Sequence, residues 1–139
     1  MRLRIALGLL TLLAVSGCSG QGPSSESVVR AWSQALNAGD NDGAADLFAR
    51  DAKVVQSGTV LRLATHKQAV EWNAALPCSG RIVAISSHGE TARATFLLGN
   101  RKTSHCDGPG QRATAIFRVR KGKIVLWHQT ANPPPGPAV

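Results

Sequence analysis

Two side chains are candidates for acid/base chemistry, His128 and Asp51. His128 lies in the predicted last strand beside Trp127, and a histidine titrates near neutral pH, where its acid and base forms are both available. Asp51 stands just before the first predicted strand, where an aspartate more often bonds the backbone amides of a turn. A histidine in a sheet is likewise more often a hydrogen-bonded structural residue. We therefore expect structural roles for both and assign no catalytic residue.

The direction of the His128 side chain depends on which face of the last strand points inward. Side chains alternate along a strand, so one of two sets faces the interior. In the first set, Ile124, Leu126 and His128 point inward, and His128 could contact a ligand. In the second set Val125, Trp127 and Gln129 point inward, and Trp127 lines the interior instead. The sequence leaves both alternatives open.

The first cysteine follows a pattern typical of an export signal. Arg2 and Arg4 precede an apolar run over residues 5–15, which is too short to span a bilayer, since a spanning helix needs about 20 residues. Residues 15–18, Val-Ser-Gly-Cys, resemble the lipobox of bacterial lipoproteins. The resemblance implies cleavage before Cys18, a diacylglyceryl group on its thiol, and a location in the cell envelope, anchored to a membrane and facing outside the cytoplasm. The alternative is an ordinary secretory peptide with an unpaired Cys18.

Lipidation of Cys18 would leave Cys78 and Cys106 as an even pair in an oxidising compartment, and we predict that they form a disulfide. A bridge that closes a loop of about 29 residues contributes roughly 3.5 kcal/mol in the chain-entropy model. Zinc is the competing use, because His105 adjoins Cys106, but further ligands at metal-binding spacing are missing from the sequence. The sequence therefore predicts no metal and no cofactor.

Positive charge is concentrated in the second half of the chain. The formal net charge is +8, and removal of Arg2 and Arg4 with the signal would leave 8 − 2 = +6. From Arg81 onward, nine Lys or Arg stand against Glu90 and Asp107. A motif for nucleic-acid binding does not accompany this charge, so anionic head groups or envelope polymers are the favoured partners and nucleic acid is not.

The loop over residues 99–110 is the strongest candidate for a binding surface. It contains glycines and carries Arg101, Lys102 and His105 beside the predicted disulfide, which would suit an anionic partner. An equally supported alternative is that the loop has no partner and is a solvated segment that the disulfide stabilises.

Apolar spacing predicts one α+β domain over residues 25–131, between a Ser/Gly-rich tether (18–24) and a Pro-rich tail (132–139). Residues 1–17 form the predicted signal peptide. Two helices are expected before the first strand, the second capped by Asp40, and a third begins at the capping box that starts with Thr65. An antiparallel meander of four strands follows over residues 81–87, 91–98, 111–120 and 123–130.

Three stretches carry a resemblance to a known family: residues 29–40, with the sequence Val-Arg-Ala-Trp-Ser-Gln-Ala-Leu-Asn-Ala-Gly-Asp, residues 44–52, and residues 122–128, Gly-Lys-Ile-Val-Leu-Trp-His. In these stretches the chain resembles the SnoaL-like branch of the nuclear transport factor 2-like superfamily. The resemblance implies a cone-shaped, curved antiparallel sheet with the three helices of the N-terminal half packed on its concave face, an apolar pocket at the open end, and a possible homodimer through the outer sheet face.

Enzymes of that superfamily place an Asp or His as proton acceptor inside the cone and support it with Tyr or a second acid. This chain has no tyrosine, and none of its eight carboxylates lies mid-strand on a predicted inward face. The sequence therefore favours a non-catalytic module that binds an apolar or anionic small ligand or an envelope partner. The alternative is a SnoaL-like isomerase, cyclase or hydrolase acting on a hydrophobic small molecule.

The main expected role of the aromatic residues is to form the core. Several of them are also expected to line the pocket. The candidates for pocket contacts are Trp32, Phe48, Trp72, Phe96, Phe117 and Trp127.

Overall fold

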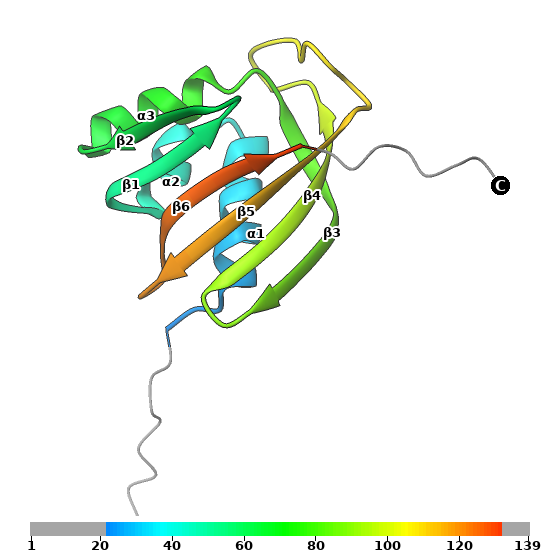
Figure 1. Cartoon of the computed structure of the whole chain (residues 1–139). Coiled ribbons are helices and arrows are strands. Elements are labelled where there is room, and N and C mark those ends of the chain that lie inside the picture. Colours follow the sequence, from blue (N-terminus) through cyan, green and yellow to red (C-terminus); the bar gives the residue numbers. More distant parts are fainter. Residues whose placement is uncertain (1–21, 132–139) are drawn as a thin grey trace, which may run out of the picture.

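The computed structural model describes residues 22–131 as one α+β domain (Figure 1). The predicted signal peptide, Cys18 and the Pro-rich tail lie outside the described residues. Within this range, no helix has both the length and the apolar character needed to cross a membrane. The elements in chain order are α1 (Ser25–Asn37), α2 (Asn41–Asp46), β1 (Phe48–Gln56), β2 (Thr59–Leu63), α3 (His66–Ala75), β3 (Ser79–His88), β4 (Thr91–Gly99), β5 (Arg112–Arg120) and β6 (Lys123–Thr130).

Each helix begins at a polar side chain that caps its free backbone amides. Ser24 accepts a hydrogen bond from the amide of Ser27, and Asp40 accepts one from the amide of Gly43. Thr65 accepts from the amide of Gln68, whose own side chain accepts from the amide of Ala64. These two bonds correspond to the predicted capping box, except that Gln68 accepts from the amide of Ala64 and not from that of Thr65, and they fix where α3 starts.

The six strands form one curved sheet in the order β2-β1-β6-β5-β4-β3. The meander from β3 to β6 is antiparallel, as predicted, and β1 pairs with β2 in the same way. β1 and β6, however, are parallel neighbours, so the sheet is mixed, and the expectation of a wholly antiparallel sheet is wrong for this pair. Both strands start at the same end of the domain, where the amide of Ile124 donates to the carbonyl oxygen of Leu47. This contact joins segments far apart in sequence, and local patterns do not encode it.

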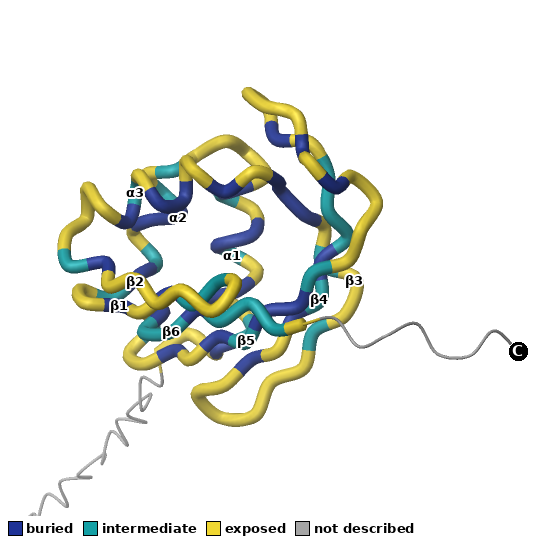
Figure 2. Tube along the Cα trace, turned by 45° about the horizontal axis from the view of Figure 1, so that its top comes forward, coloured by how far each residue is buried: buried dark blue, intermediate teal, exposed yellow. Residues whose placement is uncertain are grey.

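The helices cover the concave face of the sheet. α1 lies against β3, β4 and β5, whereas α2 and α3 pack on each other beside β1 and β2 (Figure 1). Figure 2 shows the buried stretches of α1, α2 and β5 facing this interior, while the edge strand β2 is exposed along most of its length. The helices therefore close one side of the cone, as the resemblance implied.

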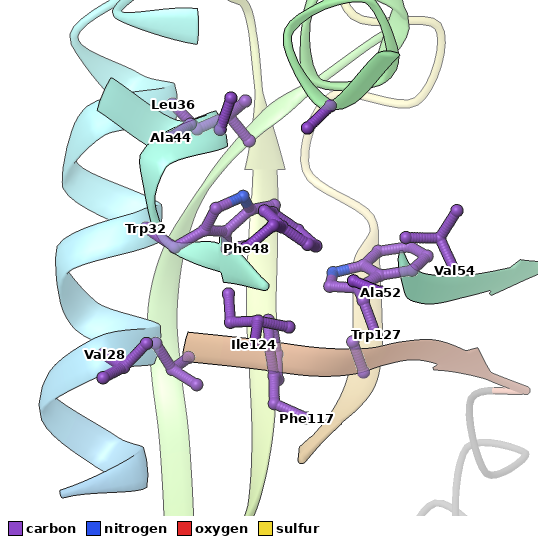
Figure 3. Packing of buried hydrophobic residues seen from close by; sticks show 14 of the residues in the cluster. Val28, Trp32, Leu36, Ala44, Phe48, Ala52, Val54, Phe117, Ile124 and Trp127 are labelled. Carbon is purple, nitrogen blue, oxygen red and sulfur yellow. The ribbon is translucent and has the colours of Figure 1, made fainter. Parts of the chain in front are cut away.

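Aromatic side chains fill the space between the helices and the sheet (Figure 3). The ring of Trp32 lies 5.4 Å from that of Phe117 and 5.9 Å from that of Phe96, and the ring of Trp72 lies 5.0 Å from that of Trp127, all edge to face. Edge-to-face pairs of this kind add about 0.5–1.5 kcal/mol each beyond the apolar area they bury.

A bulge in β6 decides which of its side chains face the interior. Arg118 of β5 pairs with Leu126, but the next residue, Val119, pairs with Ile124, so Val125 is an extra residue in the ladder. The bulge resets the alternation, and Ile124 and Trp127 both face inward with 0% and 6% of their surface exposed. Neither predicted set of inward residues is therefore correct along the whole strand.

Candidate ligand-binding site

A cavity of about 270 Å³ opens at the end of the cone where β1 and β6 finish and β3 and β5 begin. We call it the open-end cavity. Its apolar wall consists of Trp32, Leu36, Leu76, Phe96, Leu98 and Trp127, and its polar rim includes Gln56, Ser79, Asp107, Gln111 and Gln129. Pockets for small ligands commonly measure roughly 300–1,000 Å³, so this one suits a compact molecule.

α1 is fixed over the cavity by hydrogen bonds to β3. The side-chain amide of Asn37 donates to the carbonyl oxygen of Gly80 over 3.0 Å and accepts from the amide of Gly80 over the same distance, and Ser33 donates to that carbonyl over 3.2 Å. A Cβ on Gly80 would lie 2.9 Å from the Cβ of Phe96. Glycine at this position therefore lets the helix, β3 and the Phe96 ring meet closely at the cavity wall.

The two indole groups in the cavity wall differ in their hydrogen bonding. The Nε1–H of Trp32 donates to Oδ1 of Asn73 over 2.8 Å, inside the core. The Nε1–H of Trp127 is buried and has no acceptor, and it is the one such side-chain atom among residues 22–131. An unpaired buried donor costs about 1–3 kcal/mol. Both rings project into the space between α1 and the sheet (Figure 3).

The rim carries amide side chains and one carboxylate. Nε2 of Gln56 donates to Oε1 of Gln129 over 2.9 Å, across the parallel strands β1 and β6. Oδ1 of Asp107 lies 3.3 Å from the Sγ of Cys78, an atom that holds no hydrogen because it belongs to a disulfide. Of the described residues that line the cavity, Asp107 alone carries a carboxylate, and none is a histidine, lysine or arginine. Acid/base chemistry here would lack a second group.

A model of the SnoaL-like domain family matches residues 29–127, the greater part of the sequence. The chain belongs to this family. A comparison with curated proteins finds no match.

Solved structures place the SnoaL-like domain in the nuclear transport factor 2-like fold. An NTF2-like protein of unknown function from Cytophaga hutchinsonii has a TM-score of 0.65 and 13% identity, over 84% of this chain and 96% of that one. A putative polyketide cyclase from Sinorhizobium meliloti has a TM-score of 0.60 and 19% identity, over 75% and 94%. A putative ketosteroid isomerase from Kribbella flavida has a TM-score of 0.60 and 16% identity, over 81% and 83%. At these identities the likeness concerns the fold.

The two catalytic candidates of the SnoaL-like domain lie away from the open-end cavity. His128 is paired in register with Ile116 and Val55, on the outer face of the sheet, and does not line the cavity. Asp51 is exposed at an irregularity of β1 with a φ of 62° and accepts two hydrogen bonds from Arg62, over 2.7 and 2.9 Å. Neither position supplies the open-end cavity with an acid or base, and the partner of Asp51 is a side chain and not the backbone amides expected for a turn.

The aromatic candidates divide into two groups. Trp32, Phe96 and Trp127 line the open-end cavity. Phe48, Trp72 and Phe117 do not line it and belong to the core beside it, with the ring of Phe48 lying 5.6 Å from that of Trp72. Which aromatic residues reach the cavity depends on how far along its strand or helix each one sits, which spacing alone does not reveal.

The predicted disulfide between Cys78 and Cys106 is present in the SnoaL-like domain, with an S–S distance of 2.00 Å. It ties the loop after β4 to the start of β3, at the rim of the open-end cavity. The sulfur atoms and the carboxylate of Asp107 lie close enough together to suggest metal ligands. Because the two sulfurs are bonded to each other, this group has no thiolate to offer a metal.

The basic loop does not present its three predicted residues together. Arg101 is only 7% exposed, and its guanidinium donates to the carbonyl oxygens of Asn73 and Leu76 over 2.5 and 2.9 Å and to Oδ1 of Asn41 over 2.6 Å. Burial lowers the pKa of Arg101 from its ordinary value. Lys102 and His105 are exposed. Arg101 is thus turned away from an external anion, which corrects the expected grouping.

Sequence reasoning missed most of the rim. Gln56 and Gln129 come together because β6 inserts beside β1, and Asp107 reaches the rim because the disulfide draws its loop inward. The one available signal was the alternative in which Trp127 and Gln129 face inward together. The other rim residues come together through pairing between segments that are distant in the sequence.

Proposed function

We propose that the open-end cavity binds a small, neutral molecule with an apolar body and one oxygen acceptor, and that it does so without catalysis. The observation that carries the proposal is the Nε1–H of Trp127, which is buried without an acceptor on a side chain that lines the cavity. A ligand oxygen that accepts this hydrogen bond would remove the cost of the buried, unpaired donor. The aromatic and aliphatic wall supports an apolar body for the ligand.

The rim supports a neutral ligand over an anionic one. Asp107 brings a negative charge to the mouth of the cavity, and the amides of Gln56 and Gln129 add polar groups without a net charge. Arg101, one of the cations of the disulfide-tied loop, is engaged with carbonyl oxygens in the interior. We therefore narrow the ligand class from apolar or anionic to apolar and uncharged.

The enzymatic alternative, a SnoaL-like isomerase, cyclase or hydrolase, has less support. Its proton acceptor would have to be Asp107, which is exposed and has no second acid, histidine or tyrosine beside it among the described lining residues. General acid/base catalysis gains its effect from a group held beside the reacting atom with a matched pKa. One solvated carboxylate at the rim does not meet that requirement.

A pair of probes that differ in one oxygen tests the binding proposal: 1-indanone, which carries a carbonyl group, and indane, which does not. In the wild type, 1-indanone should shift the indole Nε1–H resonance of Trp127 in a ¹H–¹⁵N spectrum and gain affinity from the hydrogen bond. In Trp127→Phe, which keeps an aromatic ring but loses the donor, the affinity ratio of 1-indanone to indane should fall by about 2- to 12-fold.

Indane controls for the apolar part of binding, because the loss of the Trp127 donor should leave its affinity within a few-fold. The resonance of the Trp127 indole is assigned as the peak that disappears in Trp127→Phe. If the ratio of the two affinities is the same in both proteins, the Trp127 donor does not select an oxygen acceptor and the proposal fails. Turnover of a substrate that Asp107→Asn abolishes would instead support the enzymatic alternative.

We also propose that Cys18 carries a lipid that anchors the domain in the cell envelope. The lipobox resemblance of residues 15–18 and the apolar run before them support this proposal, and an oxidised pair, Cys78 and Cys106, is in keeping with a location outside the cytoplasm. The intact mass of detergent-extracted protein from a bacterial host tests it. We expect loss of residues 1–17 and added diacylglyceryl mass, both absent in Cys18→Ser; an unmodified Cys18 in the wild type would contradict it.

A further inference from the structure

The chain enters the folded domain at the end opposite the open-end cavity. The first described residues lie against the turn between β5 and β6: a Cβ on Gly122 would lie 3.2 Å from Cδ of Pro23. Ser25, the first residue of α1, donates to the carbonyl oxygen of Gly89 in the turn between β3 and β4. Figure 1 shows this start of the chain, in blue, beside both turns, with the disulfide-tied loop, in yellow, at the far end.

Exposed basic side chains surround this entry point. We define the basic turn surface as the side chains on β4, β5, β6 and the β5–β6 turn that lie at this end of the domain: Arg93, Arg118, Arg120, Lys121 and Lys123. All of them are exposed. Arg93 and Arg118 lie on the outer sheet face, because the residues next to them in β4 and β5, Ala92 and Phe117 among them, are buried against the core. The backbone of Lys121 adopts a φ of 50°, which places it at the tip of the turn.

Acidic residues at this end do not cancel the positive charge. Glu90 pairs with Arg120 over 3.2 Å, so the surface keeps a charge of 5 − 1 = +4. Glu26 on the first turn of α1 is paired with Arg30 over 2.8 Å. The Nζ of Lys123 donates to the backbone oxygen of Asp46, whose carboxylate lies 3.6 Å from His66. The basic turn surface therefore keeps a net positive charge.

The covalent distance from Cys18 to this patch is short. Four residue steps separate Cys18 from Gly22, and an extended chain spans at most about 3.6 Å per residue, or about 14 Å in all. The electrostatic screening length at physiological ionic strength is about 8 Å. A lipid on Cys18 would therefore hold the basic turn surface within reach of the head groups of the membrane in which the lipid sits.

We propose that the basic turn surface docks on anionic phospholipid head groups, so that the open-end cavity faces away from the membrane. This inference rests on the proposed lipid anchor at Cys18. It assigns a use to five of the nine basic residues from Arg81 onward, and it orients the domain end-on. The cavity mouth would then open to the aqueous compartment, where a ligand arrives.

Vesicle binding without the lipid tests the docking surface separately from the anchor. The probe is residues 18–139 with Cys18→Ser, sedimented with vesicles of phosphatidylglycerol and phosphatidylcholine or of phosphatidylcholine alone. We expect binding to the anionic vesicles only, and its loss in 0.5 M salt. The double variant Arg118→Gln with Lys121→Gln should bind at least tenfold more weakly, because each basic residue near an anionic surface contributes roughly a fivefold factor.

The matched control removes the same charge from the cavity end. Arg81→Gln with Lys102→Gln has the same net charge as the turn variant, and both of its positions are exposed. It should lose less than about threefold in affinity if the turn surface makes the contact. Equal losses in the two variants, or no preference for anionic vesicles, would overturn the docking proposal. Failure of the anchor is a distinct result, since it is seen in the intact mass of the wild type.

Discussion

The guanidinium of Arg101 connects three parts of the chain that form the rim and roof of the domain. It donates to backbone oxygens at the end of α3, at Asn73 and Leu76, and to the side chain of Asn41 at the start of α2. Arginine suits this position because its planar fork carries several donors that reach separate acceptors at once. Arg101, although it belongs to a basic loop, therefore links the end of α3 to the start of α2.

Substitution Arg101→Ala should lower the free energy of unfolding by about 3 kcal/mol, because at least two buried carbonyl oxygens lose their donor. Denaturant unfolding followed by tryptophan fluorescence measures the change. Lys102→Ala, at the exposed neighbouring position, provides the control and should change stability by no more than about 0.5 kcal/mol. A similar small loss for both variants would show that the Arg101 contacts do not stabilise the fold.

At the scale of elements, close contact between α1 and the start of β3 shapes one wall of the open-end cavity. Gly80 exchanges two hydrogen bonds with Asn37, and its missing side chain leaves room for Phe96. The opposite wall depends on the bulge at Val125, which brings Trp127 to the inner face of β6. The shape of the cavity thus depends on a glycine at a paired position of β3 and on a bulge in β6.

Gly80→Ala should destabilise the domain by about 1–3 kcal/mol, since its Cβ would lie 2.9 Å from the Cβ of Phe96 and packed cores resist added methyl groups. Gly99→Ala is the matched control. Gly99 pairs with Ser79 on the neighbouring strand, and a Cβ there meets no other atom within 4 Å. Thermal unfolding of both variants should show a loss only for Gly80→Ala, and equal melting temperatures would refute the role given to this contact.

For the whole molecule, the two ends of the cone differ in chemistry. The end with the β5–β6 turn is closed and basic, and the chain enters there. The other end holds the open-end cavity and the disulfide, and its rim includes one acidic residue, Asp107. The positive charge that the sequence places in its C-terminal half is therefore divided in space, and the larger part lies at the end away from the cavity.

Removal of the bridge in a Cys78→Ser, Cys106→Ser double variant should lower the free energy of unfolding by about 3.5 kcal/mol, the loop-closure contribution for this separation. It should also weaken 1-indanone binding, because Asp107 and Gln111 on the tethered loop line the cavity. Dithiothreitol should bring the wild type to the level of the variant and leave the variant unchanged. A wild type that keeps its stability after reduction would contradict this role.

The sequence by itself determined the features that depend on neighbouring residues or on composition. The caps at Asp40 and Thr65, the antiparallel meander of the last four strands and the pairing of Cys78 with Cys106 could all be predicted. A cap or a tight turn is decided within a few residues, and Cys78 and Cys106 are the two cysteines of the predicted domain, so each has one possible partner there. The resemblance in residues 29–40 and 122–128 extended this local information to the family fold.

Only the tertiary structure decided which side chains meet at the cavity. The parallel pairing of β1 with β6 joins Gln56 to Gln129 across the chain, and a pairing between segments so far apart leaves no local pattern. One extra residue at Val125 reverses the alternation that strand reasoning relies on, and so moves Trp127 to the interior. In the sequence, Arg101 has the appearance of a surface cation. Its burial depends on the carbonyl oxygens that the folded chain places around it, and these come from a distant helix.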